Sequence, residues 1–340
     1  MNQCLRRAVF CTALALLPGT LAAQERCDRA CMRSMLDQYL SAVIAHDSAK
    51  APLLAGFRQT ENAVVVPLGA GLWKTMTGLG AMQRRYVDPV SGQAAYFGVV
   101  QEGPTSAIVT VRIRVEDRKI TEAEWYVARQ GDPGLNPGRG GNLFDPDYLT
   151  MNPPAERVIP AAKRSSRASL AAIVNSYFDG ISSHNGAVVL AHPGCTRVEN
   201  GTLMTGGRRG GGAGPRAGGA APPAAPGPPA STDCVAGFAT INIAYVAARR
   251  VPVIDEEAGV ALATAVFIRP PGSPNPRNAF AEWFVIDEGK IRNIYSAMFY
   301  PGPTLAVPNW PPYDGNWPLP AGIVPPPPAA APATAGAGQN

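Results

Sequence analysis

Apolar residues recur at helical spacing in two stretches of the chain that lie 138 positions apart. The first stretch holds Met32, Met35, Leu36, Tyr39, Leu40 and Val43, and the second holds Leu170, Ile173, Val174, Tyr177, Phe178 and Ile181. Because intervals of three and four residues bring these side chains to one face, each stretch predicts an amphipathic helix. A polar turn follows each helix, at residues 46–47 and 184–185.

Three strand-like runs close the region behind each predicted helix. They cover residues 92–101, 106–115 and 119–129 in the first region, and residues 259–269, 278–286 and 290–300 in the second. Short turns separate the runs, so each set predicts an antiparallel meander. A helix followed by a sheet in one unit indicates the α+β class.

The two regions match residue by residue. At a shift of 138 positions the pairs are Tyr39 and Tyr177, His46 and His184, Glu61 and Glu199, and Asn62 and Asn200. The shift becomes 167 where Asp88 meets Asp255, and 171 where Lys119 meets Lys290. Both increases fall in loops, at an insertion over 207–233 and a longer turn over 270–277, as expected of two copies of one domain. We therefore predict domains at 24–130 and 169–302.

The remaining segments have the composition of connections. Residues 131–168 contain clustered glycine and proline, which predicts an extended linker, with Leu143, Phe144, Tyr148 and Leu149 as anchors to a domain. The insertion at 207–233 is rich in glycine and proline, and the tail at 303–340 is rich in proline and alanine. Neither holds enough apolar side chains to fold alone.

The first 23 residues have the layout of a secretory signal peptide. Arg6 and Arg7 precede an apolar run over 8–17, and small residues stand before a cleavage site near Gln24. The run is too short to span a bilayer, and no later stretch resembles a membrane helix. We expect a secreted or periplasmic protein without an integral membrane segment after cleavage. The net charge of +5 includes both leader arginines and is too small to favour nucleic acid as a partner.

Four of the six cysteines remain after the leader is removed, namely Cys27, Cys31, Cys195 and Cys234. An even number in an oxidising compartment favours disulfides, although four cysteines allow three connectivities. We predict the pairs Cys195–Cys234, which would close the loop that carries the insertion, and Cys27–Cys31. The alternative is a nucleophilic or metal-binding Cys195 beside His192, for which the sequence offers no further ligands.

Several motifs of the first copy resemble the nuclear-transport-factor-2-like, or SnoaL-like, superfamily. They are the helix with its His-Asp turn, the segment 61–73 with Pro67-Leu68-Gly69 and Gly71-Leu72-Trp73, then Asp88, Gly92-Gln93-Ala94 and Phe97-Gly98. The chain looks like tandem copies related to an uncharacterised secreted SnoaL-related family. The resemblance covers residues 30–130 and, more weakly, 169–302. It implies a curved sheet wrapped around a helix to form a cone with an apolar pocket.

Members of that superfamily include cofactor-independent dehydratases, isomerases and cyclases as well as binding domains, so the fold does not choose the function. Two carboxylates of the first copy are candidates for proton transfer. Glu122 and Glu124 share one face of the last strand, and if that face lines the cone, burial and mutual repulsion would raise one pKa. In the other interpretation Ala123, Trp125 and Val127 face the interior.

Two further candidates have a structural alternative. His46 beside Asp47 suggests a histidine oriented by a carboxylate, but the position also suits a helix end and a turn. Glu61 is a candidate acid or base, or else a partner for a backbone amide or an arginine. The aromatic residues that could line a ligand pocket, or fill the core instead, are Tyr39, Trp73, Tyr96, Tyr126, Tyr177, Trp283 and Tyr295.

The chain has three histidines and no phosphate-binding or dinucleotide-binding fingerprint, so we expect no metal and no cofactor. Two hypotheses remain. The protein is a cofactor-independent acid–base lyase or isomerase acting on an apolar or aromatic compound, or it is a non-catalytic module that binds a ligand or a protein. In either case the two cones could pair within one chain, or the protein could form a homo-oligomer.

Overall fold

The computed structural model describes residues 27–135, 141–205 and 232–300. The predicted leader, nearly all of the insertion at 207–233 and the tail at 303–340 lie outside these residues. Among the described residues, no helix is long and apolar enough to cross a membrane.

The first domain is a helix followed by a six-stranded sheet. Its elements are α1 (Arg29–Ile44), η1 (Ser48–Lys50), β1 (Leu53–Glu61), β2 (Val64–Val66), α2 (Leu72–Thr75), β3 (Gly78–Asp88), β4 (Gln93–Glu102), β5 (Thr105–Glu116) and β6 (Lys119–Arg129). The strand order in the sheet is β2-β1-β6-β5-β4-β3.

The second domain repeats this plan. Its elements are α4 (Arg167–Ser182), η3 (Gly186–Val188), β7 (Ala191–Glu199), β8 (Thr202–Leu203), η4 (Phe238–Thr240), β9 (Tyr245–Asp255), β10 (Val260–Ile268), β11 (Arg277–Asp287) and β12 (Lys290–Phe299). The order β8-β7-β12-β11-β10-β9 is the same as in the first sheet. The predicted α+β class and the tandem arrangement are confirmed.

The sheets differ from the prediction in two respects: they are mixed rather than purely antiparallel, and they contain β3 and β9, which lie outside the predicted meanders. The predicted meanders are present as β4-β5-β6 and β10-β11-β12, but β1 joins β6 in parallel, and β7 joins β12 in parallel. Sequence analysis missed β1 because its register shifts between Leu53 and Arg58, around Gly56 at φ 86°. Such an irregularity interrupts the two-residue alternation by which a strand is recognised.

Each helix lies on the concave face of its sheet, and the two form a closed core. Asp28 caps α1 by accepting a hydrogen bond from the amide of Cys31, and Ser166 caps α4 in the same way. The apolar face of α1 contacts Val111 and Trp125 of the first sheet, and that of α4 contacts Phe280 and Phe284 of the second. These two units are the cones that the resemblance implies.

The linker is less extended than predicted. It contains α3 (Pro146–Met151) and η2 (Ala161–Lys163), and Asp145 caps α3. Leu149 is fully buried, with Phe144 and Tyr148 packed against the same cluster. Three of the four predicted anchors thus hold the linker on the domains, whereas the fourth, Leu143, is exposed.

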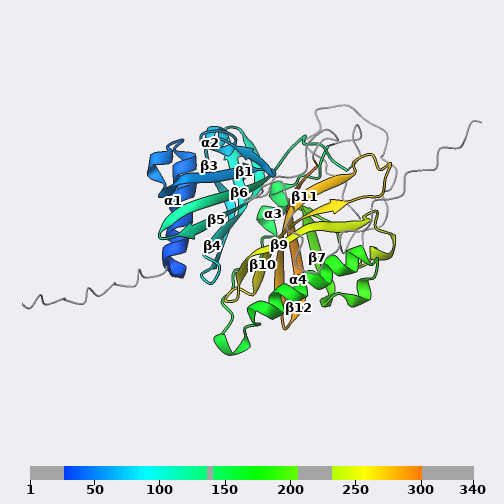
Figure 1. Ribbon diagram of the computed structural model, residues 1–340. Coiled ribbons are helices and arrows are strands. Elements are labelled where there is room, and N and C mark those ends of the chain that lie inside the picture. The colour runs from blue at the N-terminus through cyan, green and yellow to red at the C-terminus, as the bar shows by residue number, and fades with distance from the viewer. Residues whose placement is uncertain (1–26, 136–140, 206–231, 301–340) are drawn as a thin grey trace, which may run out of the picture.

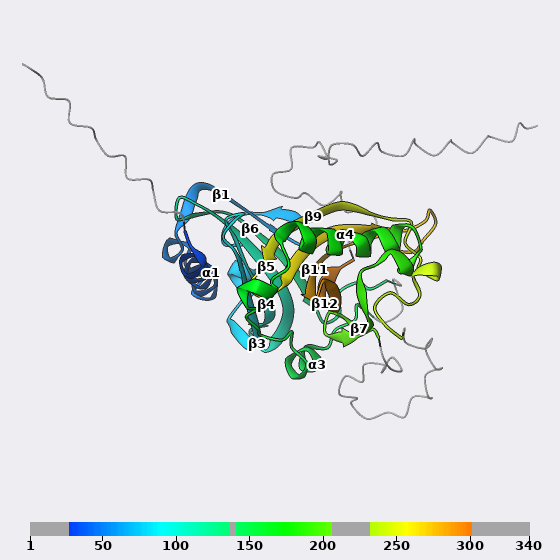
Figure 2. The ribbon, with the colours of Figure 1, turned by 90° about the horizontal axis from the view of Figure 1, so that it is seen from below.

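The two sheets pack back to back, so each has a helix on one face and the other sheet on its second face (Figures 1 and 2). Trp283 lies in this interface, and its indole nitrogen donates a hydrogen bond to Thr110 across it, at 2.9 Å. Tyr86 and Phe97 of the first sheet contact the Trp283 ring. These contacts join the backs of the two sheets.

Two buried carboxylates join the domains in a pseudo-twofold arrangement. Arg29 makes a two-pronged ion pair with Asp255, and the matching Arg167 binds Asp88, with a nitrogen to oxygen distance of 2.6 Å. Each carboxylate also accepts an amide hydrogen from the opposite domain, Asp255 from Val87 and Asp88 from Ile254. Burial alone would raise the pKa of Asp88, but the hydrogen bond from Arg167 and those from backbone amides lower it overall.

Candidate functional site

A cavity of about 610 Å³ opens at the mouth of the second cone. Its polar lining includes Arg197 and Glu199 of β7, and Arg269, which follows β10. Its apolar lining includes Phe238, Ile243, Phe267, Met298 and Tyr300. Concave sites of this size, with apolar walls and a few polar groups, are typical of small-molecule binding.

Arg197 links the cavity to a buried carboxylate behind it. Alternation along β7 turns Cys195, Arg197 and Glu199 toward the cone interior, since Val198 contacts the domain interface. The guanidinium binds Glu199 at 2.6 Å and Glu282 of β11 at 3.1 Å. Glu282 is 0% exposed, and its second carboxylate oxygen has no hydrogen-bond partner among the described residues.

This arrangement perturbs Glu282 strongly. Burial raises the pKa of Glu282 to about 7, because Arg197 offsets the loss of water only partly and the charge of Glu199 acts in the same direction as burial. Tyr177 lies in the same cluster, and its hydroxyl has no hydrogen-bond partner within the described part of the chain. Burial raises the pKa of this hydroxyl as well. The carboxyl group of Glu282 can therefore hold a proton near neutral pH, although Arg197 lies beside it.

A pH-dependent stability follows from Glu282. Its pKa is higher in the folded state than the ordinary 4.5, so its stabilising contribution is complete below pH 4.5 and is lost as the pH rises to about 7. We expect Glu282→Gln to remove this loss, which amounts to roughly 2–3 kcal/mol. Denaturant unfolding of both proteins between pH 4.5 and 8 measures the difference.

The control for this prediction is Glu116→Gln, which changes an exposed carboxylate that pairs with Arg114. We expect its unfolding free energy to run parallel to that of the unmodified protein across the pH range. If the unfolding free energies of the Glu282→Gln variant and the unmodified protein differed by a constant amount from pH 4.5 to 8, the raised pKa of Glu282 would be contradicted.

The interior of the first cone is filled by hydrogen-bonded aromatic side chains. Trp73 of α2 donates to the amide oxygen of Gln59 at 2.7 Å, and Tyr39 donates to the same oxygen at 3.3 Å. Trp125 donates to the Tyr39 hydroxyl at 3.0 Å. In the second cone Arg197 stands at the position of Gln59, and Ser296 at that of Trp125.

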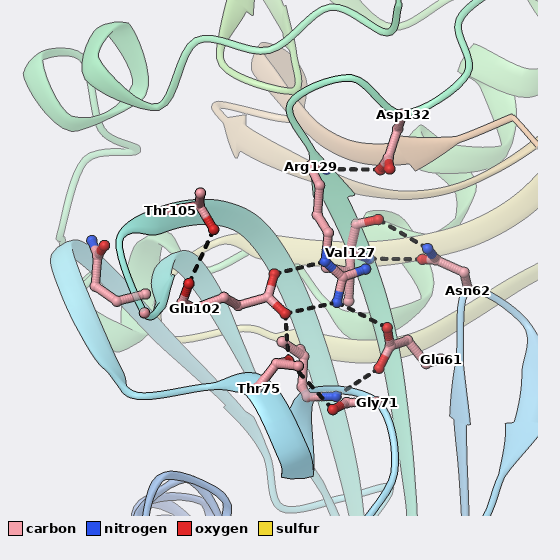
Figure 3. A network of polar contacts seen from close by, with 12 residues as sticks. Glu61, Asn62, Gly71, Thr75, Glu102, Thr105, Val127, Arg129 and Asp132 are labelled. Atoms are coloured by element: carbon pink, nitrogen blue, oxygen red, sulfur yellow. Dashed lines mark hydrogen bonds and ion pairs between the residues drawn. The ribbon is translucent and has the colours of Figure 1, made fainter.

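A charged network closes the mouth of the first cone (Figure 3). Arg129 binds Glu102 at 2.6 Å and Glu61 at 3.0 Å, and Glu61 also accepts the amide hydrogen of Leu72 at the start of α2. Thr75 of α2 donates to Glu102 at 2.5 Å. These contacts hold α2 across the mouth, so Glu61 has the backbone and arginine partners that its structural interpretation predicted.

The proposed proton carriers Glu122 and Glu124 do not line a cone. Both lie on the face of β6 that is turned toward the second domain, while Ala123, Trp125 and Val127 face the first cone. Glu124 binds Arg112 at 2.7 Å and Arg250 of β9 at 2.5 Å. Burial alone would raise its pKa, but the charges of Arg250 and Arg112 lower it. We therefore assign this pair to the interface.

His46 also has a structural environment. It occupies the turn after α1 at φ 53°, and its Nδ1 lies 2.6 Å from the carbonyl oxygen of Trp73. The matching His184 approaches the carbonyl oxygen of Ile243 at 2.8 Å. Each histidine thus anchors the segment that covers its own cone. The structure does not bring His46, Glu61 and Glu124 together.

None of the seven aromatic residues expected at a ligand pocket is among the residues that line the cavity. Tyr39, Trp73 and Tyr96 belong to the first cone's core, Tyr177 belongs to the second cone's core, and Tyr126, Trp283 and Tyr295 belong to the domain interface. Tyr177 supports the cavity wall from behind, because its ring packs edge-on against that of Phe238.

Both predicted disulfides are present, Cys27–Cys31 and Cys195–Cys234. The second ties η4 and its neighbours to β7 at the cavity. Cys195 is therefore not a free nucleophile, and His192 lies against the carbonyl oxygen of Asp287.

The sequence indicates the charged cluster at the cavity in a way that the sequence analysis did not use. Glu282 stands between Phe280 and Phe284 at alternate positions of an otherwise apolar run. A charge on the apolar face of a predicted strand calls for a buried partner. Arg197, two residues before the repeated Glu199-Asn200 motif, replaces an uncharged Gln59 and supplies that partner.

Comparisons with known proteins agree with a two-domain chain but name no function. A family described as "Domain of unknown function (DUF8021)" matches residues 163–298, which is the second domain. A protein of unknown function with a cystatin-like fold from Methylobium petroleophilum PM1 is 16% identical. The match covers 42% of this chain and 82% of that chain, with a TM-score of 0.26. No curated protein matches.

Neither match is to a SnoaL-like protein by name, so that assignment stays a prediction.

Proposed function

We propose that this protein binds a small, partly apolar molecule in the cavity of its second domain, and that the first domain supports it. The observation that carries the proposal is the difference between the two cones. Residues 59, 73 and 125 fill the first, while the second keeps a cavity of about 610 Å³ beside buried charged groups. The two disulfides suit an exported protein in an oxidising compartment.

The proposal is tested by filling the cavity. Ala236 lines it, and Ala236→Trp would place an indole ring in the space. We expect the unmodified protein to bind the neutral fluorescent probe N-phenyl-1-naphthylamine at one saturable site, and the variant to lose at least 10-fold in affinity.

The matched control is Ala187→Trp, which adds the same ring at an exposed position of η3. It should bind the probe as the unmodified protein does. Absence of saturable binding to the unmodified protein, or equal binding by the two variants, would refute the proposal.

Acid–base catalysis on an apolar or aromatic compound is the second candidate, now placed in the second cone. It is favoured by the proton that Glu282 holds near pH 7 and by Glu199, whose carboxylate lines the cavity. In an isomerisation Glu199 would take a proton from one carbon of the bound compound and return it to another, and Arg197 would stabilise the ionised carboxylate. A lyase or isomerase step of this kind requires no cofactor.

A further inference from the structure

Arg269 is a buried cation at the cavity wall whose hydrogen-bond acceptors are neutral. The residue is 8% exposed and lines the cavity. Its guanidinium donates to the carbonyl oxygen of Asn275 at 3.3 Å and to the amide oxygen of Asn278 at 2.6 Å. It also lies 5.6 Å from the centre of the Tyr300 ring. Across the described residues, no carboxylate approaches Arg269 within ion-pair distance.

The other arginine of the cavity differs in this respect. Arg197 is held between two carboxylates, so its charge is already compensated. Glu199 acts on Arg269 only through space, and burial lowers the pKa of Arg269. A buried charge without a counter-charge is costly, and an anion that entered the cavity would reduce that cost.

In the first domain the positions that match Arg269 and Tyr300 hold a pair of opposite charges. The repeat places Glu102 at the position of Arg269, and Arg129 at that of Tyr300. Glu102 and Arg129 form an ion pair at 2.6 Å that closes the mouth of the first cone. The second copy therefore has a cation and an aromatic ring where the first has a self-sufficient ion pair.

The rest of the wall favours an apolar body on the ligand. Phe238, Ile243, Phe267 and Met298 line the cavity together with Tyr300. We propose that the cavity selects organic anions, with a carboxylate or sulfonate against Arg269 and an aromatic or aliphatic body against these apolar side chains. This inference rests on the proposed function and adds the chemical class of the ligand.

Two probes with the same ring skeleton test the selection. 8-Anilinonaphthalene-1-sulfonate carries an anionic group, and N-phenyl-1-naphthylamine lacks it. We expect the unmodified protein to bind the anionic probe about 10- to 100-fold more tightly, as a charge-assisted hydrogen bond in a buried site provides. The Ala236→Trp variant should weaken both probes, which places them in the cavity.

Arg269→Met keeps an unbranched apolar stem and removes the charged guanidinium. We expect it to abolish the preference for the anion and to leave the neutral probe within about threefold of its original affinity. Arg269→Lys, which keeps the charge, should retain most of the preference and serves if the methionine variant does not fold. Arg85→Met is the matched control, because Arg85 lies 5.6 Å from the Tyr96 ring in the first domain, away from the cavity.

The results separate the two levels of the proposal. If neither probe binds at a saturable site, the proposed function is wrong and the inference with it. If both bind with equal affinity, or if Arg269→Met keeps the preference for the anion, the ligand class is wrong while the cavity remains a binding site.

Discussion

Replacing Asp255 with alanine is expected to lower the free energy of unfolding by about 3–5 kcal/mol, because the carboxylate is fully buried and serves both domains. The change would leave the amides of Val87 and Ala258 without an acceptor and would remove the ion pair with Arg29. Denaturant unfolding at pH 7 with the disulfides intact measures the loss. Asp88→Ala should cost a similar amount. Asp88 binds Arg167 and the amide of Ile254 in the second domain, and it accepts the amide hydrogen of Ser91 in its own domain.

The control is Glu257→Ala. Glu257 also pairs with Arg29, at 3.2 Å, but its side chain is 31% exposed. Ion pairs that water reaches contribute about 0–1 kcal/mol, so this variant should be nearly as stable as the unmodified protein. A loss in Asp255→Ala no larger than in Glu257→Ala would contradict the view that the buried carboxylates hold the domains together.

Removing the Cys195–Cys234 disulfide is expected to have an effect of similar size. The bond closes a loop with a sequence separation of 39 residues, for which the loop-entropy model gives a stabilisation of about 4 kcal/mol. The double variant Cys195→Ser with Cys234→Ser should therefore unfold at a much lower denaturant concentration. Because Cys234 positions Phe238 against Tyr177, binding of the neutral probe in the cavity should also weaken.

The Cys27–Cys31 bond provides the comparison. Its sequence separation is 4, so the same model assigns it about 2 kcal/mol, and it lies in the first domain at the start of α1. Replacing both of its cysteines should leave probe binding in the second domain unchanged. If removing the Cys195–Cys234 disulfide lowered the free energy of unfolding by less than about 1 kcal/mol, this bond would restrict the unfolded chain very little.

The sequence was sufficient to predict the helices, the closing meanders and the repeat, because these depend on local periodicity. It was insufficient to predict which strand face lines a cone. Along β11 nearly every side chain is buried, with Phe280 turned toward the helix and Trp283 toward the other sheet. A sheet covered on both faces has no polar side to mark its outside, so alternation alone could not orient Glu124.

The location of the cavity was beyond local patterns for a different reason. It depends on which distant side chains fill each cone, such as Trp73 of α2 and Trp125 of β6, whose partners become neighbours only after folding. Glu282 was nevertheless detectable as a lone charge in an apolar run. The repeat identified corresponding positions, but the site lies where the copies differ.

The ion pair between Glu124 and Arg250 has no charged counterpart across the pseudo-twofold axis, since Tyr295 stands at the position of Glu124 and Arg84 at the register position of Arg250. Two second domains placed together in the same way would bury Arg250 opposite Tyr295, without a carboxylate. The second half is therefore committed to the first by charge. A copy that diverged after duplication in this manner gives up symmetric self-association.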